Sequence, residues 1–183
     1  MKTTTTILER IAIALASLAL SVGAIALLSG FFAGRDPAGV SGIASGPGLA
    51  FVDLGHAHLR PGERHPVYDS RPPTSGAHFP LPVTREDVRL SVDQLLQALE
   101  VGNVVIVYGT SSPPPGLRTL ARALAPPFTP ALAAAGQAVI LARRRGVTGL
   151  LGLAWAHAMP ASTPNAALRA FTAFWLGRGA LGH

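Results

Sequence analysis

Histidines are the residues of this chain whose type and spacing suit metal binding or proton transfer. His56 and His58 lie two positions apart, so both side chains share one face if that segment is extended. His78 follows in the segment YDSRPPTSGAHFP, residues 68–80. Imidazole suits copper and zinc, so His56, His58 and His78 form a candidate metal site. The chain has no cysteine, which excludes thiolate ligands, disulfides and a cysteine nucleophile.

Two other interpretations of the same residues remain open. In the first, which we favour over a metal site, His78 and Glu100 form a buried hydrogen-bonded pair that holds a loop to a sheet. In the second, Ser75 or Thr74 is a nucleophile, His78 its base and Glu100 the orienting carboxylate. Ser75 follows prolines, however, whereas a nucleophile elbow lies between a strand and a helix. The sequence therefore favours a non-catalytic binding role over a hydrolase.

Residues 68–80 have the composition of a rigid loop. The paired prolines fix their own φ and push the residues before them into extended conformations. The short hydroxyls can bond nearby backbone groups, and the glycine permits a turn that other residues resist. Such a loop holds its histidine in one place. The candidate ligand-binding or structural residues are Tyr68, Pro72, Pro73, Thr74, Ser75, Gly76, His78 and Glu100.

Four stretches have the pattern of strands that would support this loop. Val104–Tyr108 is continuously apolar and mostly β-branched, which is typical of a buried central strand. A short strand is expected from Leu49. Residues 137–142 and 147–156 are expected to form a hairpin, because the glycine between them supplies a positive φ.

Helical patterns alternate with these strands. Apolar residues three and four apart over Glu86–Glu100 predict a helix, and Leu117–Leu124 predicts a shorter one. Thr163 is expected to cap the last helix, with Pro164 at its first position. We therefore predict an α+β fold, with a small α/β sandwich, a mixed sheet of about three or four strands and helices covering one face.

Residues 11–33 carry no charge and are mostly apolar. A stretch of about 20 apolar residues spans the hydrocarbon core of a membrane as a helix. A cleaved signal peptide is the alternative, but its apolar region is about 7–15 residues long and ends in a small-x-small site. Phe31 and Phe32 crowd the best such site. The sequence favours an uncleaved transmembrane anchor.

The anchor divides the chain into four parts. Residues 1–10 form a cytoplasmic N-terminus and 11–33 form the anchor, an orientation favoured by the distribution of basic residues. Residues 34–48 are rich in Gly, Ser and Pro and predict a flexible linker. Residues 49–183 form an extracytoplasmic globular domain. We expect a single-pass protein of the plasma membrane.

The net charge of +6 does not indicate a nucleic-acid partner. Most of the arginines are scattered and do not form a basic stripe interleaved with aromatic residues. The expected partners are the membrane, through the N-terminal helix, and an unidentified protein or small ligand. No cofactor is expected other than the copper or zinc of the metal hypothesis.

Two motifs carry a resemblance to a known family. The segment PPTSGAH, preceded by Tyr68, resembles the PPTSGPH signature of the bacterial domain of unknown function 3105 family, with Ala77 in place of a proline. The segment QALEVG, which runs into an apolar strand, resembles the HxLEHG signature of the same family. Gln97 and Val101 stand where that signature has histidines.

The resemblance covers the chain from about Leu49 onward. It implies an anchored extracytoplasmic domain whose upstream family histidine corresponds to His58. It also implies a strand ending in Ala154-Trp155 and a closing helix over Leu168–Trp175. The family pattern is richer in histidine, which makes a metal site natural, while this chain has fewer ligands to offer.

Overall fold

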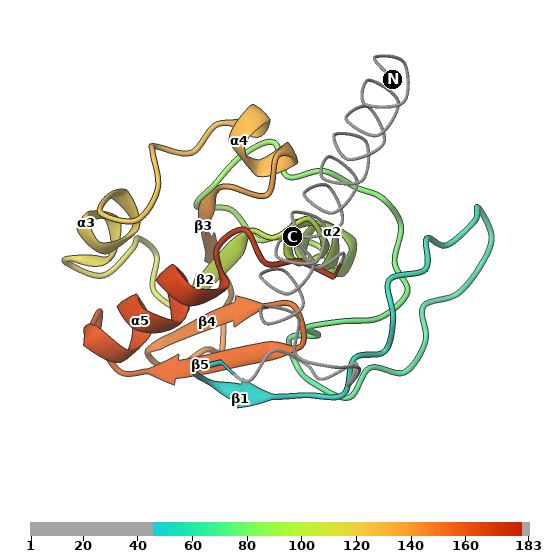
Figure 1. Cartoon of the computed structure of the whole chain (residues 1–183), viewed down its shortest axis with the longest axis horizontal. Coiled ribbons are helices and arrows are strands. Elements are labelled where there is room, and N and C mark those ends of the chain that lie inside the picture. Colours follow the sequence, from blue (N-terminus) through green and yellow to red (C-terminus); the bar gives the residue numbers. More distant parts are fainter. Residues whose placement is uncertain (1–45, 181–183) are drawn as a thin grey trace, which may run out of the picture. The chain divides into compact units, whose positions relative to one another are not determined.

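The computed structural model describes residues 46–180 (Figure 1). The predicted cytoplasmic N-terminus, the anchor at 11–33 and most of the predicted linker lie outside these residues. Among residues 46–180, no helix is long and apolar enough to cross a membrane. Residues 46–48, assigned above to the linker, contact the domain, because Trp175 Nε1–H donates a hydrogen bond of 2.9 Å to the carbonyl of Pro47.

The prediction of an α+β fold with a mixed sheet is confirmed, but the sheet has five strands in the order β1-β5-β4-β2-β3 (Figure 1). The central strand β2 pairs in parallel with β3 and antiparallel with β4. Strand β5 pairs antiparallel with both β4 and β1. The strands are β1 (Leu49–Ala50), β2 (Val104–Tyr108), β3 (Val139–Arg143), β4 (Leu150–Ala154) and β5 (His157–Ala161).

The predicted hairpin between residues 137–142 and 147–156 is wrong. Strands β3 and β4 lie on opposite sides of β2, so the chain between them crosses the end of the central strand. Gly146 does have a positive φ of 86°, but its turn lies in the connection that crosses from β3 to β4. The hairpin in the sheet joins β4 to β5 through Trp155 and Ala156, and Ala156 has a φ of 54°.

Side chains of β2 alternate between two buried faces, so helices are needed on both faces of the sheet. Val105 and Val107 pack with the apolar side of α2, and Ala133 of α4 belongs to the same cluster. Val104, Ile106 and Tyr108 pack with α3 and α5 on the other side. The prediction that helices cover one face is therefore wrong. The helices are α2 (Val92–Glu100), α3 (Leu117–Arg122), α4 (Pro130–Ala134) and α5 (Ala166–Trp175).

Two helices begin later than the sequence predicts. The helix expected from Glu86 begins at Val92, where Ser91 and Gln94 form a capping box. The residues before it run beside β3 instead, since Val88 O accepts a 3.0 Å hydrogen bond from Arg143 N–H. The last helix is capped by Asn165, whose Oδ1 accepts a 2.9 Å hydrogen bond from Leu168 N–H, so Thr163 is not the cap.

Candidate functional site

The Pro-rich segment lies beside the segment that carries His58. Gly76 N–H donates to Gly55 O at 2.8 Å, and His78 N–H donates to Ala57 O at 3.1 Å. A parallel β-bridge pairs His58 with His78, and Leu59 N–H donates a 2.8 Å hydrogen bond to His78 O within it. Backbone hydrogen bonds therefore bring two histidines from distant parts of the sequence side by side.

The hydroxyls of the loop serve its architecture. Ser75 Oγ donates to Val52 O and accepts from Leu54 N–H, both at 3.0 Å. Thr74 Oγ1 lies 3.3 Å from Ser70 Oγ, and both side chains are buried. Among residues 46–180, neither hydroxyl of the proposed triad bonds a histidine. Pro72 and Pro73 are buried as well.

Tyr68 and Gly76 fit each other closely. Tyr68 O–H donates to Ala77 O at 2.7 Å. Burial, reinforced by the charge of Asp93, raises the pKa of Tyr68 to about 12. Gly76 has a φ of 118°, and a Cβ at this position would lie 2.9 Å from a carbon of the Tyr68 ring. The tyrosine of the motif therefore requires the glycine, and together they set the path of the chain into His78.

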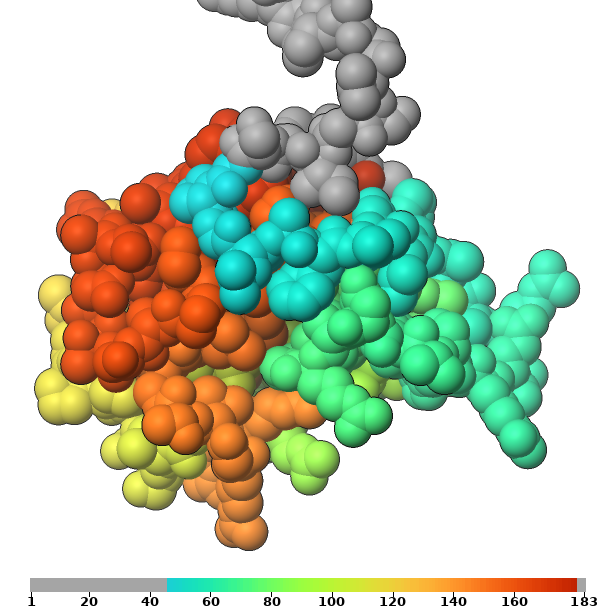
Figure 2. Space-filling view, turned by 90° about the horizontal axis from the view of Figure 1, so that it is seen from below, coloured from blue at the N-terminus to red at the C-terminus, as the bar shows by residue number. Residues whose placement is uncertain are grey.

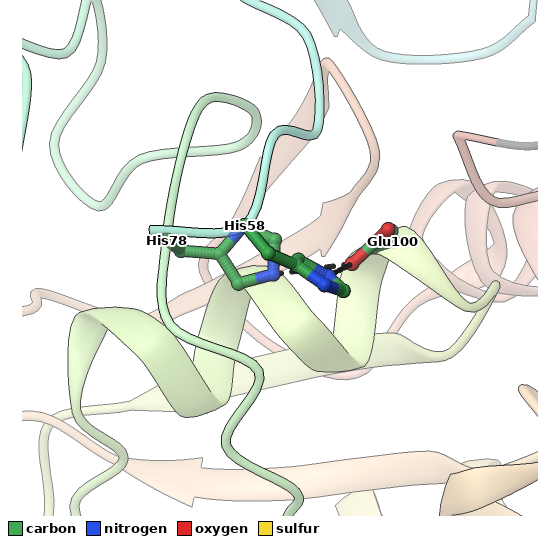
Figure 3. Close-up of side chains that lie close together, drawn as sticks. All are labelled: His58, His78 and Glu100. Atoms are coloured by element: carbon green, nitrogen blue, oxygen red, sulfur yellow. Dashed lines mark hydrogen bonds and ion pairs between the residues drawn. The ribbon is translucent and has the colours of Figure 1, made fainter. Parts of the chain in front are cut away.

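Three potential ligands converge at the end of α2 (Figure 3). His58 Nε2 and His78 Nε2 each lie 3.1 Å from Glu100 Oε2, and one ligand atom from each residue lies within 4.8 Å of the others. The side chains of His78 and Glu100 are 0% and 7% exposed, whereas that of His58 is 47% exposed. The cluster is thus buried on one side and reached from solvent past His58.

The hydrogen bonding of His78 fixes which nitrogen faces the cluster. Its Nδ1 lies 3.0 Å from Gly76 O, and a carbonyl can only accept, so Nδ1 carries the proton. When the ring is neutral, its Nε2 presents a lone pair toward Glu100. That nitrogen is buried and, despite the 3.1 Å separation, is not aligned for a hydrogen bond. Two electron-rich atoms face each other, which is stable when a proton or a cation lies between them.

Polar groups around the cluster extend it along α2. Gln97, one turn before Glu100, has its Nε2 3.4 Å from Glu100 Oε2. Asp93 Oδ1 accepts from Phe79 N–H at 2.9 Å and lies 2.7 Å from His65 Nε2. Burial of Asp93 acts to raise its pKa, but the hydrogen bonds from His65 and Phe79, with the nearby histidines, bring that pKa below its usual value.

Of the three histidines predicted as ligands, the structure brings His58 and His78 together with Glu100. His56 is not part of this cluster and lies with its ring centroid 6.5 Å from that of Trp155. The segment forms a single bridge at His58 and no regular strand, so alternation of faces does not place His56 beside it. Asp93 was not identified from the sequence, where it is an ordinary first-turn acid of a helix.

These features define an α+β domain with a buried Pro-Gly loop and a cluster of two histidines and one carboxylate. Residues 61–175, more than half of the 183-residue chain, match the family described as "Protein of unknown function (DUF3105)". The chain belongs to this family. A search of the curated proteins and a search of the solved structures found no match.

Proposed function

We propose that this domain binds one divalent transition-metal ion through His58, His78 and Glu100. The observation that carries the proposal is the buried Nε2 of His78, which has no hydrogen-bond partner and faces the Glu100 carboxylate at 3.1 Å. A histidine that donates Nδ1–H to a backbone carbonyl is the usual form of a metal ligand, because that bond fixes the tautomer and the ring orientation. In His78 the carbonyl is that of Gly76.

The distances suit a single ion. Zinc–ligand bonds of about 2.1 Å place ligand atoms about 3.4 Å apart in a tetrahedral site. Two of the separations here are 3.1 Å, and the remaining one falls within 4.8 Å. The side chain of His58 is 47% exposed, which leaves room for its ring to move toward His78.

The donor atoms favour zinc or copper(II). Two imidazoles and one carboxylate are a common set for Zn²⁺, and imidazole also suits Cu²⁺. The chain has no cysteine, and Met159 is the only methionine after Met1, so the soft sulfur ligands that select copper(I) are missing.

We further propose that the domain acts as a non-catalytic binding or accessory module outside the cytoplasm. The apolar, uncharged stretch at 11–33 supports an anchor, and the membrane is then one partner. The hydroxyls of Ser75 and Thr74 bond backbone groups and Ser70, which favours binding over the hydrolase alternative. An unidentified protein or small ligand remains the expected second partner.

The test is metal content and affinity of the full chain in detergent, before and after incubation with Zn²⁺ or Cu²⁺. We expect one ion per chain, and loss of that ion in His78→Ala and Glu100→Gln. The matched control is His56→Ala, which removes a histidine from the same segment outside the cluster. The proposal is wrong if the wild-type protein binds no stoichiometric ion, or if His56→Ala loses as much metal as His78→Ala.

A further inference from the structure

We propose that Gln97 supplies the fourth ligand to this ion through its side-chain oxygen, an inference that rests on the metal site proposed above. Gln97 and Glu100 are three residues apart on α2 and therefore lie on one face of the helix. The Gln97 side chain already touches the cluster, since its Nε2 is 3.4 Å from Glu100 Oε2. No other amide side chain of residues 46–180 has a hydrogen bond to Glu100.

The hydrogen bonding of this amide is incomplete. Gln97 Oε1 is buried and has no hydrogen-bond partner within residues 46–180. The bond from Nε2 is near the outer limit for an N–H···O contact. A buried carbonyl without a donor is rare in folded proteins, and an ordered water or a bound ion is the usual partner of such an atom.

A half-turn of the amide group places Oε1 where Nε2 now lies. The terminal torsion of glutamine is broad, and the oxygen and nitrogen have nearly the same shape, so the turn needs little space. Oε1 would then lie about as far from Glu100 Oε2 as two ligands lie in a tetrahedral zinc site, roughly 3.4 Å. Two facing oxygens repel each other without an ion. A divalent cation between them reverses that preference, so the ion itself makes the turn favourable.

This assignment changes the character of the site. Two nitrogens from histidine and two oxygens from Glu100 and Gln97 complete a four-coordinate set. Zinc sites with four protein ligands hold the ion, whereas catalytic sites keep one position open for water. The ion here is therefore bound as a structural element or as cargo, and a neutral amide is the ligand that is most easily exchanged. The hard oxygen pair also disfavours copper(I).

The experiment compares wild type, Gln97→Leu and Gln97→His in the full chain. Gln97→Leu keeps the approximate size but removes both polar atoms, and we expect Zn²⁺ affinity by chelator competition to fall about tenfold or more. Gln97→His places a third nitrogen on the same helix face. The hyperfine pattern of bound Cu²⁺ in electron paramagnetic resonance is expected to show three nitrogens in this variant and two in wild type.

A structural role gives a different result. The Gln97 side chain makes a single long hydrogen bond, from Nε2 to Glu100, so Gln97→Leu should lower the thermal midpoint of the metal-free protein only slightly while it lowers the affinity. Gln137→Leu is the matched control, because Gln137 is exposed and distant in sequence from the cluster.

If wild type binds one ion and Gln97→Leu binds it equally tightly with the same Cu²⁺ spectrum, Gln97 is not a ligand but the three-residue site stands. If wild type binds no ion, both proposals are overturned. Should Gln97→Leu fail to fold, a two-nitrogen spectrum for Gln97→His overturns the assignment of Gln97.

Discussion

Replacing Gly76 with alanine tests whether the fit between the loop and Tyr68 holds His78 in place. Gly76 has a φ of 118°, and its new Cβ would lie 2.9 Å and 3.0 Å from two ring carbons of Tyr68. A sparsely populated backbone conformation costs a non-glycine residue about 1–3 kcal/mol. Overpacking of a buried contact costs about 1–3 kcal/mol more. We expect Gly76→Ala to lower the free energy of unfolding by about 2–6 kcal/mol.

Gly62 offers a matched control in the same half of the domain. It has a φ of 92°, but a Cβ there would meet nothing within 4 Å. It lies in the exposed stretch at 61–67, which stands out from the rest of the domain in Figure 2. Gly62→Ala therefore carries only the backbone term, about 1–3 kcal/mol at most. The difference between the two variants isolates the contact with Tyr68.

The assay is urea unfolding of the full chain in detergent, followed by tryptophan fluorescence. Both tryptophans of the chain, Trp155 and Trp175, lie buried in the domain, so the signal reports its unfolding. Domains of this size usually unfold in one transition, and the free energy follows from linear extrapolation. Equal stability of Gly76→Ala and Gly62→Ala would refute the reasoning. In a Tyr68→Ala background, Gly76→Ala should cost less free energy of unfolding than it does in the wild type, because the ring that the new Cβ would meet is gone.

Three further predictions concern charges and polar groups outside the proposed metal ligands. Burial, with the hydrogen bond to Asp87, raises the pKa of Tyr108 to about 12. The stabilisation from the protonated Tyr108 is therefore complete below about pH 10, the pKa in the unfolded chain, and is lost as pH rises toward 12. Stability of Tyr108→Phe should fall less steeply over that window, and an identical slope contradicts the assignment. The pKa of Asp93 is lowered, so its contribution is present above about pH 4 and is lost as pH falls through the lowered value. Acid titration of the metal-free protein should show a weaker pH dependence for Asp93→Asn than for wild type. Asn103 is buried and bonds Ala98 O at 3.1 Å, Ala133 O at 2.7 Å and Ala138 N–H at 2.8 Å, so Asn103→Ala should lower the unfolding free energy by about 2–4 kcal/mol. A loss below about 1 kcal/mol in urea unfolding would mean that water replaces these bonds.

The sequence was informative where a pattern is local and repeated. Val104–Tyr108 is apolar at every position, and it is the buried central strand of the sheet. The α+β class and the approximate C-terminal ends of α2, α3 and α5 follow from the same kind of pattern, whereas α4 was not predicted. The pairing of the strands does not follow from the sequence. The side chains of a strand show whether its faces are buried, but they do not show which strand hydrogen-bonds to each of its edges. β2 uses both sides, and the turn at Gly146 leads the chain across its end.

Helix starts were misplaced for a related reason. Thr163 and Asn165 are both good N-caps, and only the extended backbone at Asn165, with φ −138° and ψ 176°, lets a side chain reach the first free N–H groups. Glu86 to Leu90 has helical apolar spacing, but its backbone bonds to β3 at Asp87 and Val88. Tertiary contacts decided between local alternatives that the sequence leaves nearly equal.

The site shows how a loop without regular structure can hold a histidine against a carboxylate. The loop hydroxyls form hydrogen bonds with backbone carbonyls, an N–H group and Ser70; they belong to Ser75, Thr74 and Tyr68. These bonds fix the loop, and none of them involves a histidine. Among the buried side chains of this loop, His78 alone keeps a polar atom without a hydrogen bond. A loop that satisfies every other buried polar group and leaves a single nitrogen facing a carboxylate is organised around that nitrogen. Rigidity of the loop is therefore expected to lower the entropy lost on the proposed metal binding, since only the His58 ring and the Gln97 amide have to move.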